Sequence, residues 1–192
     1  LLYHYTGVDP LTGIYQFTDQ NQDGLLSSPD DKQTVVSLTP DYFGGFQNQL
    51  SYKSWKLDFL FQFVKQRNAS NLVGMAGSMA NRAERLVDNW RESGDIRSYQ
   101  IYTTGLNAAA VTAQSRYTSS DATIVDASYI RLKTVSISYQ LPLHLKGLQC
   151  SIILQGQNLL TFTSYDDGDP EFKNSGFLPP LKIINAGIQV TF

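Results

Sequence analysis

Long, strict alternation of apolar and polar residues constrains this 192-residue chain more than any other feature. In residues 42–53 and 55–64, one alternate set of side chains is mostly apolar and the other is mostly polar. A period of two places these sets on opposite faces of a β-strand. Residues 128–141, 148–160 and 181–192 repeat the pattern. The sequence therefore predicts five long strands.

The length of these strands favours a membrane over water. Soluble strands average about 5–6 residues, whereas a membrane-crossing strand needs about 9–11. The polar set is mostly Gln, Asn, Ser, Thr and Gly, which suits an enclosed wet interior. Short connections (53–54 and 142–147) alternate with long ones (66–125 and 163–180), as turns and extracellular loops do in bacterial barrels. We therefore predict an all-β fold: an antiparallel transmembrane β-barrel segment with long extracellular loops.

Five strands cannot close a barrel, because the smallest membrane barrels have about eight. We therefore expect the chain to be a piece of something longer. The alternative is a soluble extracellular β-sandwich that binds calcium and serves adhesion, since its strands would also alternate. Solubility without detergent would separate the two. A net charge of −2 gives no basic excess, which argues against a nucleic-acid partner.

The remaining segments are less regular. Residues 1–40 are rich in turn formers, and short strands are expected at 3–6 and 14–18. The long connection 66–125 should contain a helix over 81–92, with polar, irregular sequence following to Asp121. Within it Trp90, Ile101 and Tyr102 either anchor a partner or pack against the loop itself.

One loop has the spacing of a calcium site. Carboxylate and amide side chains at Asp19, Asn21, Asp23 and Asp30, with the backbone of Leu25, follow the ligand order of an EF-hand loop, although Asp replaces its final Glu. The alternative is a series of Asx turns in a solvated loop, and no helical pattern flanks the segment. Ca²⁺ is therefore the one cofactor that the sequence suggests.

No catalytic constellation is evident, and no enzyme activity is expected. His4 and His144 are far apart in turn-rich contexts, and the acidic residues Asp166, Asp167 and Asp169 suggest a solvated or partner-contacting loop. The last alternating segment ends in Ile188, Val190 and Phe192, a pattern that resembles the terminal signal read by the barrel-assembly machinery.

Several motifs resemble one family along the whole chain. YIRLKTVSISYQLP at 129–142 and QNLLTFT at 157–163, followed by Asp169-Pro170-Glu171, are similar to the end of SusC/RagA-like TonB-dependent transporters. PDYFGGF at 40–46 and the DPLTG segment at 9–13 also match, whereas Leu160 departs from the family's usual Phe.

The resemblance implies the carboxy-terminal part of a plugged barrel of about 22 strands. Residues 1–40 would form an extracellular loop region, 41–65 a hairpin, 66–125 an extracellular loop with a short helix, and 126–192 the last three strands. It also implies an outer-membrane location in a Gram-negative, Bacteroidota-like cell, and active import of glycans or peptides. The implied partners are the rest of the barrel, a SusD-like surface lipoprotein, the TonB complex, the assembly machinery and membrane lipid.

Overall fold

The computed structural model describes residues 1–70, 74, 77, 79, 81–82, 84–142, 148–172 and 178–192. These residues form two compact units. Unit 1 comprises residues 1–38 and 68–125, and unit 2 comprises residues 39–67 and 126–192. In the described part of the chain, no helix is both long and apolar enough to span a membrane.

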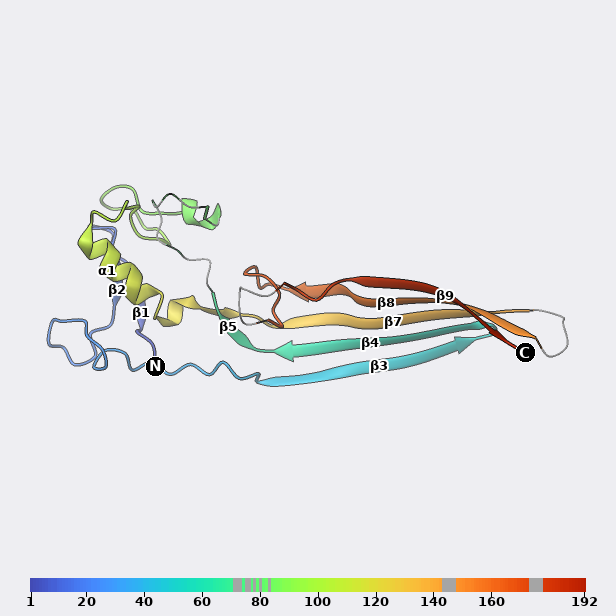
Figure 1. Cartoon of the computed structure of the whole chain (residues 1–192). Coiled ribbons are helices and arrows are strands. Elements are labelled where there is room, and N and C mark those ends of the chain that lie inside the picture. Colours follow the sequence, from blue (N-terminus) through green and yellow to red (C-terminus); the bar gives the residue numbers. More distant parts are fainter. Residues whose placement is uncertain are drawn as a thin grey trace. The chain divides into compact units, whose positions relative to one another are not determined.

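Unit 2 is a single antiparallel sheet of five strands in chain order (Figure 1). The five predicted long strands are confirmed, with shifts of a few residues at their ends. Their bounds are β3 Tyr42–Tyr52, β4 Trp55–Lys65, β7 Tyr129–Leu141, β8 Gln149–Thr163 and β9 Ile183–Thr191. The two-residue turn at Lys53 and Ser54 joins β3 to β4, as expected, and most of the 142–147 turn lies outside the described residues.

A bulge in β7 keeps the apolar side chains on one face. Val135 and Leu132 have opposite parity in the sequence, so a regular strand would point them to opposite faces. In the pairing with β4, Leu60 faces Thr134, and the next residue of β4, Phe61, faces Leu132. Lys133 therefore has no partner in β4. One extra residue of this kind is a β-bulge. Strand β8 accommodates the same irregularity near Asn158, whose φ is +52°.

Unit 1 contains two short paired strands, β1 Tyr5–Val8 and β2 Tyr15–Phe17; the second lies within the predicted range 14–18, and the first begins two residues after the predicted range 3–6 does. Its helical elements are η1 Glu84–Val87, α1 Ala108–Tyr117 and η2 Asp121–Thr123. A core formed by Tyr3, Tyr15, Phe17, Leu86, Ala113 and Tyr117 joins β1 and β2 to α1. The rings of Tyr15 and Tyr117 stack with centroids 4.2 Å apart. Strands β5 Arg67–Ala69 and β6 Ile124–Asp126 form a further pair.

The helix prediction was wrong in position. Among the described residues of 81–92 only η1 is helical, and the α-helix lies in the segment expected to be irregular. Asn107 caps α1 by accepting a hydrogen bond from the Ala110 N–H, which satisfies one free amide of its first turn. Ala110, Ala113 and Tyr117 then bury one side of the helix. This cap and tertiary packing stabilise α1.

Candidate functional site

One face of the unit 2 sheet is apolar across all five strands. The register aligns Leu50, Leu57, Ile137, Leu154 and Ala186 in one row. A second row, beyond the bulge, aligns Phe46, Phe61, Leu132 and Leu160. Leu50 is 53% exposed and Leu160 is 52% exposed, far more than a core position allows. A continuous exposed apolar surface of this kind marks contact with lipid or with another protein.

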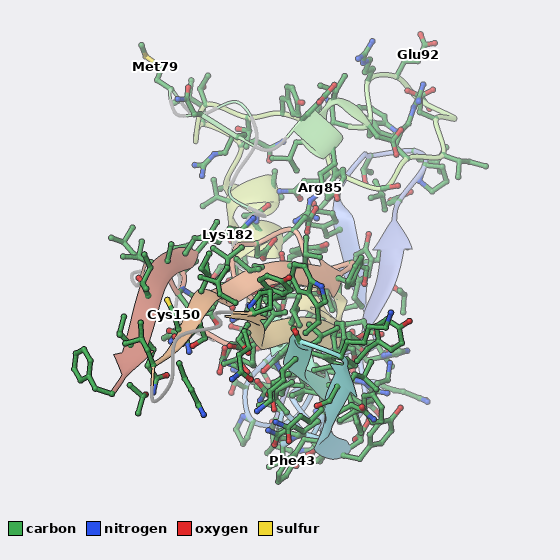
Figure 2. The ribbon with its side chains drawn as sticks, turned by 90° about the vertical axis from the view of Figure 1, so that its right-hand side faces the viewer. Phe43, Met79, Arg85, Glu92, Cys150 and Lys182 are labelled. Carbon is green, nitrogen blue, oxygen red and sulfur yellow. The ribbon has the colours of Figure 1, made fainter. Side chains whose placement is uncertain are left out.

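The opposite face is polar. A central row across the sheet aligns Gln49, Asp58, Ser136, Gln155 and Asn185. Near the 53–54 turn, a hollow of about 240 Å³ is lined mainly by Ser, Gln and Lys side chains, including Lys56, Gln140 and Gln189. Phe43, labelled in Figure 2, is an apolar exception on this face. The two faces therefore match a sheet that separates lipid from a wet interior.

Aromatic side chains occupy both ends of the apolar face. Trp55 and Tyr139 lie with ring centroids 4.6 Å apart, and Tyr52 pairs with Trp55 at the same end. Tyr42 and Phe162 line a largely apolar hollow at the other end. Tyr42 and Tyr52 terminate β3, which has 11 residues, so their Cα atoms are about 33 Å apart at about 3.3 Å per residue. A tilt of about 40° reduces this to about 25 Å, the height of the apolar band of a membrane barrel.

The apolar orientation predicted for β9 agrees with this register. Ile184, Ala186, Ile188 and Val190 align with the apolar set of β8. Ile188 faces Ile152, which faces Tyr139, so it lies in an aromatic end row and not at the middle of the face. The central row contains Val135 instead, between Phe59 and Gly156. The assembly-signal assignment of Ile188, Val190 and Phe192 stays a prediction.

An ion cluster on the polar face was not foreseen. The Arg131 guanidinium is 1% exposed and contacts the Asp169 and Glu171 carboxylates, each at 2.6 Å. Its Nε donates to Thr161 Oγ1 at 3.0 Å, and Lys133 Nζ lies 2.9 Å from Glu171. Asp169, 13% exposed, therefore belongs to this cluster, which corrects the prediction of a solvated acidic loop at that residue, whereas Asp166 is exposed. The signal available in the sequence was the pair of cations at 131 and 133, set in an otherwise neutral strand.

The predicted calcium loop is shaped by hydrogen bonds to its own backbone. Asp19 accepts from the N–H groups of Gln22 and Gly24 at 2.8 Å, and Asp23 accepts from Leu25 at 2.7 Å. Asn21 donates to Asp23 at 2.9 Å, and Asp30 accepts from the Ser27 hydroxyl at 3.3 Å. Within the described residues, no three acidic, His or Cys side chains converge on a common metal position. Calcium binding by Asp19, Asn21, Asp23, Leu25 and Asp30 stays a prediction.

Asp31, outside the predicted ligand set, anchors this loop. Its carboxylate is fully buried and accepts from the N–H groups of Ser27 and Gln20, both at 2.7 Å. Both bonds hold the pKa of Asp31 below its usual value, and the bond from the Ser27 N–H has the larger effect. The stabilisation that Asp31 gives the folded loop is therefore fully present above the pKa of Asp31 in the unfolded chain. It is lost as the pH falls through the lowered pKa of Asp31 in the folded chain.

We expect Asp31→Ala to loosen residues 19–31 by about 1–3 kcal/mol, because it leaves buried N–H groups unpaired. Asp30→Ala, which removes only one long exposed bond, should cost less than about 0.5 kcal/mol. Amide hydrogen exchange of the loop, with and without millimolar Ca²⁺, measures both effects. Slower exchange with Ca²⁺, abolished by Asp30→Ala, would support the metal site; equal exchange in the two variants would contradict the anchoring role of Asp31.

Most of the other predicted side chains lie in unit 1. Trp90 is 8% exposed and packs against residues 9–13 of the same unit, where its Nε1 donates to the Pro10 carbonyl at 3.0 Å. It is therefore no free anchor for a partner, whereas Tyr102 is 43% exposed and Ile101 is half-buried. His4 pairs with Asp121 at 2.6 Å, and His144 lies outside the described residues.

Comparison with known proteins gives relatives over nearly the whole chain. TonB-dependent receptor P26 of Formosa agariphila is 30% identical over 96% of the chain, and TonB-dependent receptor P3 of the same organism is 34% identical over 81%. The aligned regions are 20% and 15% of those proteins, so the chain spans about a fifth of their length or less. No family model matches the chain.

Solved structures share the fold. Two states of the RagAB peptide importer, open-open and closed-closed, each match with a TM-score of 0.76 at 22% and 23% identity. Each match covers 100% of this chain and 22% of the importer chain. The long antiparallel strands and their two unlike faces define a stretch of outer-membrane β-barrel wall. With the sequence identities above, the chain belongs to the TonB-dependent receptors.

Proposed function

We propose that this chain forms part of the wall and loops of an outer-membrane transporter that actively imports nutrients. The observation that carries the proposal is the exposed apolar face, which runs across the strands of the sheet and has aromatic residues at both ends. A soluble sandwich would bury this face as its core, whereas Leu50 and Leu160 are about half exposed. The names of the relatives describe receptors and an importer, which also favours transport over catalysis.

The proposed cargo is a glycan or a peptide too large for a porin, and the proposed energy source is the TonB complex. The polar face would line the passage with neutral hydrogen-bonding groups such as Gln49, Ser136 and Gln155. These groups can donate to and accept from either cargo class. Growth of a deletion strain on defined glycans or peptides, with and without the restored receptor, would identify the class.

The connections indicate which end faces outward. Strands β3 and β4 are joined by two residues, whereas β4 and β7 are separated by most of unit 1. Short turns are periplasmic and long loops extracellular in bacterial barrels. We therefore place residues 1–40, 66–125 and 163–180 outside the cell, in a Bacteroidota-like outer membrane. A SusD-like lipoprotein would dock there, on exposed apolar residues such as Ile96 and Leu106.

Cysteine labelling of intact cells tests this orientation. In a Cys150→Ser background, a membrane-impermeant maleimide should label Leu106→Cys, a residue that is 93% exposed. Lys53→Cys, in the two-residue turn, should react only after the outer membrane is permeabilised. Labelling of Lys53→Cys in intact cells, with Leu106→Cys protected, would reverse the orientation. Labelling of both variants in a soluble, detergent-free receptor would exclude the membrane proposal.

A further inference from the structure

The segment that follows β8 folds back onto the polar face of the sheet. Residues 165–172, called the strap below, begin at Tyr165, which is 8% exposed. Pro170 is also buried. A connecting loop ordinarily stays at the surface, since its backbone polar groups need water or another partner. The strap must therefore be fixed by specific contacts.

Four charges supply most of these contacts. Arg131 and Lys133 of β7 oppose Asp169 and Glu171 of the strap, so the cluster is formally neutral. The guanidinium reaches three partners at once: Thr161 on β8, both oxygens of Asp169, and Glu171. A planar guanidinium with five N–H donors can bond to three partners in different directions, whereas an ammonium group cannot reproduce the same set of hydrogen bonds. Arg131 also lies over the Tyr129 ring, 5.3 Å from its centroid.

A neutral contact from the residue just after β4 holds the same segment. Gln66, which follows β4, donates through Nε2 to the Pro170 carbonyl at 2.6 Å and to the Ala127 carbonyl at 3.3 Å. The strap is also braced internally, because Asp169 accepts from the Glu171 N–H at 2.9 Å. The Asp169 carbonyl accepts from the Phe172 N–H at 3.0 Å.

The β7 bulge explains how both cations reach the strap. In a regular strand, Arg131 and Lys133 would share a face, but then Val135 would share it too. The extra residue at Lys133 shifts the register instead. Arg131 and Lys133 thus both contact Glu171, while Leu132 and Val135 align with the apolar set. The bulge lets one strand present a cation pair to the polar side without breaking its apolar face.

We propose that the strap is a latched segment that narrows the passage at the loop end of the barrel, with the Arg131–Asp169–Glu171–Lys133 cluster as its latch. Its position over a passage rests on the proposed function; the latch itself does not. A buried guanidinium with satisfied carboxylate partners resists local opening, whereas removal of one partner leaves uncompensated charge. Loss of Arg131 should therefore release the strap, while loss of Lys133, which is 26% exposed, should have a smaller effect.

Hydrogen exchange of the intact receptor in detergent tests the latch. In the unsubstituted receptor, amides of residues 169–172 should exchange slowly for a loop. Arg131→Met should accelerate them by about tenfold or more, with β3 and β9 unchanged. Lys133→Met is the matched control and should give a smaller increase in the exchange rate of these amides. The exchange rate in Arg131→Lys should lie between those of Arg131→Met and the unsubstituted receptor. Fast exchange in the unsubstituted receptor, or no acceleration in Arg131→Met, would overturn the latch.

A second variant keeps the test decisive if Arg131→Met does not assemble. Asp169→Asn retains the size of the side chain while removing one charge, and Gln66→Leu removes the neutral contact. Each should accelerate exchange in residues 169–172, and unchanged exchange in both would overturn the latch.

Labelling of Gln62→Cys on intact Cys150→Ser cells then tests whether the strap narrows the passage. Gln62 pairs with Arg131, so Arg131→Met should increase its reaction with a polymer-linked maleimide. Accelerated exchange without increased labelling would preserve the latch and overturn the claim that the strap narrows the passage.

Discussion

Val135→Arg is expected to cost about 2–4 kcal/mol of folding free energy in the membrane, because it places a cation near the middle of the apolar face. Val135 is central in β7, which is itself the middle strand of the sheet. Its neighbours across the sheet are Phe59 and Gly156, neither of which carries a negative charge that could neutralise a guanidinium. Urea titration of the receptor refolded into lipid vesicles measures the cost, and the amount of folded receptor in outer-membrane fractions gives the cellular counterpart.

Ser136→Arg is the matched control, one residue further along the same strand. Ser136 lies on the polar face between Asp58 and Gln155, so a new guanidinium would be hydrated and near a carboxylate. We expect a cost below about 1 kcal/mol. Ile188→Arg should also cost less than Val135→Arg, because Ile188 lies in the row of Tyr139, where the apolar band ends. Equal costs for Val135→Arg and Ser136→Arg would refute the assignment of the two faces.

Alternation predicted the long strands well because each residue of a membrane-crossing strand meets one of two unlike environments. The bulge at Lys133 was harder to predict, since a change of parity in one strand becomes interpretable only beside its partners. The helix α1 was missed for a related reason. Its sequence carries no strong apolar stripe, and Ala113 and Tyr117 are buried by contacts with segments distant in the sequence.

The polar contacts show the same limit. The spacing of Asp19, Asn21 and Asp23 suggested converging ligands, yet the same short side chains satisfy nearby backbone amides. The partner of Arg131 could not be read from spacing, because Asp169 lies 38 residues away and reaches β7 only when its loop folds back. Local patterns therefore predicted the strands and their faces, whereas the ion cluster and the anchoring role of Asp31 depend on long-range contacts or burial.

Gly13→Ala is expected to destabilise the contact between residues 9–13 and the Trp90 segment by about 2–5 kcal/mol. Gly13 has a φ of +69°, a left-handed conformation that costs a residue with a Cβ about 1–2 kcal/mol. The new Cβ would also clash with the Trp90 ring, and overpacking of this kind adds about 1–3 kcal/mol. Trp90 cannot withdraw freely, since its ring is buried and its Nε1 is bonded to the Pro10 carbonyl.

Gly24→Ala separates the two contributions. Gly24 also has a positive φ, +80°, but its added Cβ would meet nothing within 4 Å. Gly24→Ala should therefore show the backbone cost of about 1–2 kcal/mol alone. Amide exchange of residues 84–102 in the intact receptor should accelerate about tenfold or more in Gly13→Ala and remain unchanged in Gly24→Ala. If exchange of residues 84–102 in Gly13→Ala matched that of the unsubstituted receptor, the packing of the 9–13 turn against Trp90 would be refuted, because the steric conflict depends on that contact.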